Sequence, residues 1–249
     1  MASTKYFRSI LCFFSGFDFN ISNLTIRYGL NVSALNPFGG AFDWDAGTDG
    51  TGTLKITNCK IINNATVITD GSFPLADGGG ISLTNEFPGA ATTGSVTISG
   101  SSISGNVAQD TGGGVFLGGL PMTMSNTQIS NNQALDDPSS QKLGQSGGQQ
   151  AGGGISIFGP GVGQTIIQNS SIFGNQADTQ GGGIFTTAGV LISTSKIYSN
   201  QASQSGGGIF SRVVNETTSV IATNITSNTA GGNGGGIEVD SGSQGTRPN

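Results

Sequence analysis

Short apolar runs that alternate with polar residues recur along the chain, and they predict β-strands with one buried face. Examples are Leu54-x-Ile56, Val96-x-Ile98 and Val190-x-Ile192. Side chains along a strand point to opposite faces in turn, so this spacing of two favours strands. The pair Ile81 and Leu83 shows the same alternation directly after a glycine cluster. We therefore expect an all-β protein.

Three signals repeat in a fixed order: Gly-Gly-Gly-Ile/Val, an alternating apolar run, and Ile-x-x-Asn. The glycine clusters begin at Gly78, Gly112, Gly152, Gly181, Gly206 and Gly234. The shortest full period is 25 residues, from Gly181 to Gly206, which suits one coil of a three-sided solenoid. A single coil cannot bury its own apolar face, whereas stacked coils bury a continuous core. The repeats predict a right-handed, single-stranded parallel β-helix with three strands per coil.

The asparagine of Ile-x-x-Asn is expected at a tight corner. Asn tolerates the left-handed region, and its side chain can bond backbone groups. Stacking would align these residues into a structural ladder of Asn64, Asn106, Asn132, Asn175, Asn200 and Asn228. The glycine clusters would allow a sharp turn with positive φ. For both sets a structural role outweighs a role in binding a ligand.

With these motifs the sequence resembles the polymorphic outer membrane protein repeats and related β-helix surface proteins. Gly39-Gly40-Ala41-Phe42 is close to the Gly-Gly-Ala-Ile motif of that family, and Ile-x-x-Asn stands where the family has Phe-x-x-Asn. Later copies carry Gly where the family has Ala, and Gly29 replaces the first Asn. The resemblance implies a β-helix with an adhesive or passenger role.

The repeats set the expected boundaries. Residues 17–240 should form the β-helix domain, and residues 241–249 a flexible tail. Residues 1–16 fit an incomplete first coil or cap, or a weak signal-like segment. Six residues link Asn175 to Gly181, but insertions lengthen this link between Ala65 and Asp77 and between Gln133 and Ala151. Both insertions leave from the same corner and are expected to carry binding.

Composition narrows the function classes. The net charge is −5, with nine Lys and Arg and no His. Nucleic-acid binding is not expected, because phosphate binding needs clustered cations. Cys12 and Cys59 give neither a disulfide framework nor metal-ligand spacing, so no metal or cofactor is predicted. The chain contains no run of 18 apolar residues, so no transmembrane helix is expected.

Carbohydrate-active enzymes share this fold, so the carboxylates of the chain are candidate catalytic groups. Glycoside hydrolysis needs two carboxyl groups that flank the scissile bond. Weak candidates are Asp43 and Asp45, with Trp44 as a stacking surface for a sugar, and the pair Asp136-Asp137. All lie where Asp is an ordinary turn or loop residue, and the absence of His removes the commonest general base. No catalytic residue is assigned.

Two function classes remain. The favoured one is a secreted or cell-surface module, a fragment of a larger surface protein associated with the outer membrane through a missing region. It would play an adhesive or structural role and bind a host or environmental glycan or protein. The alternative is a polysaccharide lyase or glycoside hydrolase on a pectate-lyase-like β-helix.

Overall fold

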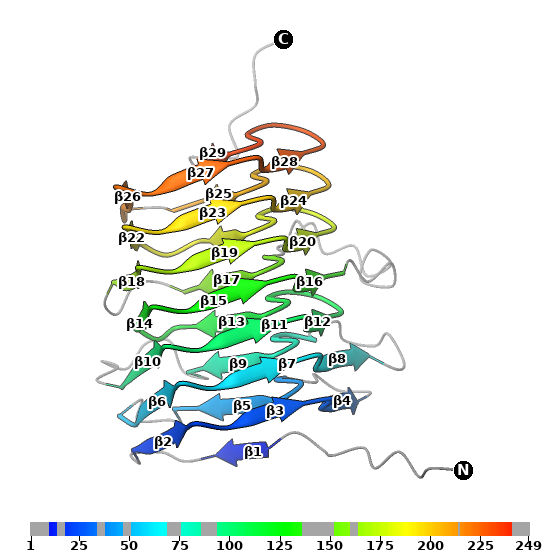
Figure 1. Cartoon of the computed structure of the whole chain (residues 1–249), viewed down its shortest axis with the longest axis vertical. Coiled ribbons are helices and arrows are strands. Elements are labelled where there is room, and N and C mark those ends of the chain that lie inside the picture. Colours follow the sequence, from blue (N-terminus) through cyan, green and yellow to red (C-terminus); the bar gives the residue numbers. More distant parts are fainter. Residues whose placement is uncertain are drawn as a thin grey trace.

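The chain coils into a parallel β-helix. The computed structural model describes residues 10–13, 18–33, 38–46, 51–68, 76–85, 94–135, 152–159, 164–213 and 215–240. As the chain rises from its N-terminus, the near strands run left to right and the far strands right to left, which makes the coil right-handed (Figure 1). Every strand pair is parallel, and the described residues contain no helix.

Four sheets form the sides of the solenoid, and each takes one strand from successive coils. The first sheet contains β1 (Ile10–Phe13), β5 (Phe42–Asp45), β9 (Ile81–Thr84), β13 (Val115–Gly118), β17 (Ile155–Phe158), β21 (Ile184–Thr186), β25 (Ile209–Ser211) and β29 (Ile237–Val239). The second contains β2 (Phe19–Ser22), β6 (Thr53–Thr57), β10 (Ser95–Ser99), β14 (Met122–Ser125), β18 (Thr165–Gln168), β22 (Val190–Ser193) and β26 (Thr218–Ile221).

The remaining two sheets complete each coil. The third contains β3 (Thr25–Arg27), β7 (Lys60–Ile62), β11 (Ser102–Ser104), β15 (Gln128–Ser130), β19 (Ser171–Phe173), β23 (Lys196–Tyr198) and β27 (Asn224–Thr226). The fourth contains β4 (Leu30–Ser33), β8 (Ala65–Ile68), β12 (Val107–Ala108), β16 (Gln133–Ala134), β20 (Gln176–Ala177), β24 (Gln201–Ala202) and β28 (Thr229–Ala230).

The prediction of a three-sided solenoid was wrong in the number of sides, because the fourth sheet was missed. Its strands follow the ladder asparagines, and most are two residues long, as in β12. Two residues cannot display an alternating pattern. Each contributes one inward side chain, an alanine at Ala108, Ala134, Ala177 and Ala202, and all four are buried.

The core consists of columns of aliphatic side chains. In the third sheet Ile61, Ile103, Ile129, Ile172 and Ile197 pair in register and are at most 1% exposed. Burying an aliphatic side chain of this size contributes about 1.5–3 kcal/mol. The first and second sheets supply similar columns, and nearly all these residues belong to one continuous cluster.

The three glycines of the cluster that begins at Gly181 are required for two different reasons. Gly181, the first of its cluster, has a φ of +67°, as expected for a sharp turn. Gly182 and Gly183 do not have positive φ. A Cβ on Gly182 would collide with backbone atoms of Gln201, and one on Gly183 would lie 2.5 Å from the carbonyl oxygen of Gly208. The second and third glycines therefore allow close stacking of successive coils.

The ladder asparagines form one hydrogen-bonded column at the corner between the third and fourth sheets. The Oδ1 atom of Asn200 accepts from the backbone N–H of Asn175 at 3.0 Å and from its Nδ2 at 2.9 Å. Asn200 in turn donates through Nδ2 to the Ile172 carbonyl and to Oδ1 of Asn228. In the first coil Gly29 replaces the Asn and donates its N–H to Asn64. The column thus satisfies a backbone N–H that no strand pairs.

The sequence had predicted that the ladder asparagine itself adopts the left-handed conformation at this corner. In the structure the residue before it does so instead. Asn63, Asn131 and Ser199 have φ values of 55°, 54° and 54°, and Gly105 and Gly174 occupy the same position in their coils. A left-handed residue there directs the following asparagine into the core. The ladder asparagine itself is needed because its buried side-chain amide forms the hydrogen bonds of the column.

A second column, of hydroxyl groups, lines the corner between the second and third sheets. The backbone N–H groups of Ser101, Thr127 and Ser170 donate to the hydroxyl of the next coil at 3.4, 3.2 and 3.1 Å. Each hydroxyl donates to the carbonyl two residues before it, as Thr127 does to Ser125. Cys59 occupies this position in its coil, and its buried thiol lies 3.3 Å from the Thr57 carbonyl.

One buried carboxyl lies at the turn before the first sheet. Asp77 is 3% exposed and accepts a 2.6 Å hydrogen bond from the Thr111 hydroxyl. Burial disfavours its charged form and raises its pKa to about 6, although the hydrogen bonds from Thr111 act in the opposite direction. Asp77 is therefore protonated more readily in the folded chain than in the unfolded one.

The ends of the chain are described only in part. Residues 10–13 form β1 and pair with β5 in the first sheet. The rest of segment 1–16, the tail 241–249, and most of the two insertions lie outside the described residues. The signal-like and tail assignments remain predictions.

Replacing Asn200 with Ala should lower the free energy of unfolding by about 1–3 kcal/mol, because backbone groups would lose their partner in a buried site. Its matched control is Ser199→Gly, since the exposed Ser199 has a φ at which Gly is unstrained and occurs in other coils. Urea unfolding measures the free energy of unfolding of both variants and of the parent. Equal stability of the Asn200 variant and the parent would contradict a role for the ladder in stability.

Asp77→Asn should change how stability depends on pH. Since the folded pKa of about 6 exceeds the unfolded value of 3.8, the parent loses stability as the pH rises from about 4 to above 6. The variant cannot ionise at this position, so it should avoid this loss and at pH 8 keep about 1–3 kcal/mol of stability that the parent has lost. Urea unfolding at pH 4 and pH 8 tests this. A stability difference between variant and parent that is the same at both pH values would refute it.

Candidate functional site

Trp44 does not offer a surface for a sugar, contrary to the sequence-based candidate. It points into the core from β5, pairs in register with Leu83, and is fully buried. Its indole Nε1 has no hydrogen-bond partner among the described residues. The alternation in Phe42-Asp43-Trp44-Asp45 explains this, because the two aromatic residues share the core face of the strand.

The candidate carboxylates do not form an open acidic site in the described part of the chain. Asp43 and Asp45 lie on the opposite face of β5 from Trp44 and are 7% and 5% exposed. Both have interaction partners. Little of either carboxyl is therefore open to a polymeric substrate. Asp136 and Asp137 lie outside the described residues.

A shallow groove of about 480 Å³ follows the corner between the second and third sheets. We call it the corner groove. Its outer rim is formed by Asn58, Gly100, Asn126 and Asn169. Its other side is formed by the first residues of the third-sheet strands, Lys60, Ser102, Gln128 and Ser171. Cys59, Ser101 and Thr127 from the hydroxyl column also line it.

The backbone holds the groove's amide groups outward. Asn58, Asn126 and Asn169 have φ values of 53°, 50° and 49°, and all three are exposed. Asn is among the few residues that tolerate this conformation, which explains its recurrence at the rim. The residue after each of them points inward and joins the hydroxyl column. The hydrogen bonds of that column therefore fix the floor from which the rim amides project.

The fold sorts charged residues onto different sides of the solenoid. The second- and third-sheet strands carry four cations and no acidic residue among their described positions: Arg27, Lys55, Lys60 and Lys196. The first-sheet strands carry Asp43, Asp45 and Glu238 and no cation. Lys55 and Lys60 lie five residues apart in one coil, and the register places Arg27 in the coil below them.

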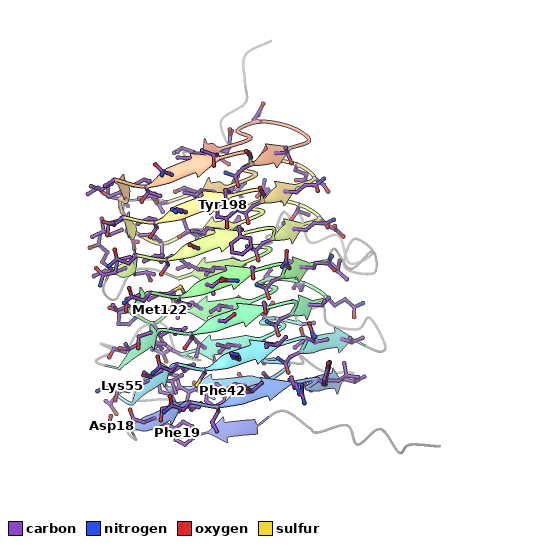
Figure 2. All side chains as sticks on the ribbon, in the orientation of Figure 1. Asp18, Phe19, Phe42, Lys55, Met122 and Tyr198 are labelled. Carbon is purple, nitrogen blue, oxygen red and sulfur yellow. The ribbon has the colours of Figure 1, made fainter. Side chains whose placement is uncertain are left out.

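Two aromatic residues project from the third sheet at one end of the groove. Phe173 and Tyr198 stack with their ring centroids 4.8 Å apart and their planes 9° from parallel. Both are half-buried, and Tyr198 lies on the near face of the solenoid (Figure 2). They follow Ser171 and Lys196 by two residues and so share the outer face with them.

These groups are suited to binding. The groove presents amides, hydroxyls and one ammonium group, which together donate and accept hydrogen bonds. Sequence reasoning missed this site. The recurrence of Ser or Thr five residues before the ladder asparagine, at Ser101, Thr127, Ser170 and Ser195, was the available signal.

The described residues contain no helix long and apolar enough to cross a membrane. Within the same ranges, no three His, Cys, Asp or Glu side chains are grouped so that they could hold a metal ion.

Comparison with known proteins gives one match. Residues 169–187 match the Chlamydia polymorphic membrane protein repeat. This segment contains β19, the ladder residue Asn175, β20, the glycine cluster from Gly181, and β21, which together form most of one coil. No curated protein and no solved structure matches the chain. The other coils repeat the same strands and ladder contacts, so the chain is a right-handed parallel β-helix that resembles the polymorphic membrane protein repeats.

Proposed function

We propose that the chain is an adhesive module of a cell-surface or secreted protein. The observation that carries this proposal is the polymorphic membrane protein repeat at residues 169–187, because it lies in a coil whose architecture the described chain repeats. The name of that family places its members at membranes. A role at the cell surface is therefore the hypothesis that accounts for both the repeat and the fold.

The architecture supports a role in binding. Parallel coils with a continuous aliphatic core form a stiff scaffold, and stacking builds an extended lateral surface from many short strands. A polar groove runs along one corner of that surface. Rigid surfaces lose little conformational entropy when they bind, which favours affinity.

The enzyme alternative has less support. Of its four candidate carboxylates, Asp43 and Asp45 are nearly buried. The groove itself is lined by amides, hydroxyls, a thiol and an ammonium group rather than by a pair of carboxyls.

The folded chain should bind saturably to animal cell surfaces or to extracellular matrix, at least about tenfold above a heat-denatured sample. Binding of the labelled chain is measured by flow cytometry and on a glycan array. Polysaccharides from the same incubations are assayed for new reducing ends and for unsaturated uronates. Absence of binding on every surface would refute an adhesive role, and steady product formation would establish the enzyme alternative instead.

A further inference from the structure

We propose that the corner groove binds an acidic polysaccharide, whose chain lies along the solenoid axis with its carboxylate or sulfate groups near Arg27, Lys55 and Lys60. This inference rests on the proposed adhesive function and names the ligand class for it. Three features of the outer surface carry the inference: the repeat spacing of the groove, the charge of its surroundings and the aromatic pair.

The spacing of the groove favours a polymer. Neighbouring parallel strands lie about 4.8 Å apart, so each coil offers its amide and hydroxyl groups one such step further along the axis. Asn126 and Asn169 stand in successive coils, and Gln128 and Ser171 repeat with them. A shallow groove with regularly repeated polar groups suits a chain of repeated polar units. A compact ligand would instead need an enclosed pocket.

The charge around the groove favours an anion. The chain as a whole has a net charge of −5, yet the strands that flank the groove carry only cations. Lys55 and Lys60 are exposed on either side of the corner in one coil, and Arg27 is exposed in the coil below. None of these three forms an ion pair with a described residue, whereas Arg212 pairs with Asp240 at 2.9 Å. Cations without an ion-pair partner at a polar groove attract carboxylates or sulfates. Arg27, whose guanidinium also lies over the Tyr28 ring, adds positive charge one coil below.

The aromatic pair favours a sugar over other anionic polymers. Phe173 and Tyr198 lie on the third sheet beside Ser171 and Lys196, in the direction in which the groove runs. From Lys60 in β7 to Lys196 in β23 there are four strand-to-strand steps, or roughly 19 Å. The apolar face of a pyranose ring can pack on an aromatic side chain while its hydroxyls bond amides. This distance accommodates several sugar units of an extended chain.

Binding to defined polymers tests the ligand class. The full chain is titrated with polygalacturonate, heparin, dextran and single-stranded oligo-dC. We expect polygalacturonate or heparin to bind, and their relative affinities distinguish carboxylate from sulfate recognition. Affinity should fall by about tenfold or more as salt rises from about 50 to 200 mM. Equal binding of dextran, equal binding of oligo-dC, or no binding of either acidic polysaccharide would overturn the proposal.

A pair of matched substitutions tests the site. Asn126 and Asn131 belong to one coil, are both exposed, and have φ values of 50° and 54°. Only Asn126 lines the groove. Asn126→Asp should weaken acidic polysaccharide binding by about tenfold through repulsion, whereas Asn131→Asp should change it by less than about twofold. Equal effects of the two variants would overturn the site assignment, and thermal unfolding verifies that both remain folded.

Removing the cations tests their role. Lys55→Gln combined with Lys60→Gln should weaken binding by about tenfold and flatten its salt dependence. Arg212→Gln, which removes a cation outside the groove, should leave affinity within about twofold. Unchanged affinity in the double variant would overturn the proposed anion contact. If cell-surface binding persists while no acidic polysaccharide binds, this inference fails and the adhesive function stands.

Discussion

Every coil of this protein must turn sharply between its third and fourth sheets, and the turn leaves a backbone N–H that no strand pairs. A buried N–H without a partner costs about 1–3 kcal/mol. The carboxamide of the next coil's asparagine resolves this. Asn132, for example, accepts from the N–H and the side chain of Asn106 through Oδ1, and donates through Nδ2 to Ile103 and Asn175. All four hydrogen-bonding positions of this buried amide are used.

This arrangement requires that successive coils stay in parallel and in register. A shift by one residue would break the asparagine column and turn the isoleucines of the third sheet outward. The hydroxyl column at the neighbouring corner imposes the same register through Ser101, Thr127 and Ser170. Register then fixes the outer surface as well, since equivalent positions form rows. The corner groove and the sorted charges are consequences of these rows.

The sequence predicted the all-β class, the parallel coil and the asparagine positions, because each depends on residues that recur at fixed spacing. It failed on the fourth sheet, because most strands of that sheet are too short to show an alternating pattern. It offered Trp44 as a weak candidate for stacking on a sugar because of its aromatic ring, although the spacing to Phe42 predicts a buried side chain. The corner groove depends on which residues of different coils lie side by side, and insertions of unequal length conceal that register in the linear sequence.

Residue-resolved hydrogen exchange tests the dependence of the fold on the ladder most directly. If the asparagine column maintains the stack, the backbone N–H groups of Asn106, Asn132 and Asn175 exchange only through global unfolding. Their opening free energies should then equal those of central strand amides such as Ile129 in β15. Exchange of these corner amides at rates close to those of exposed loop residues, with the strands still protected, would contradict the account.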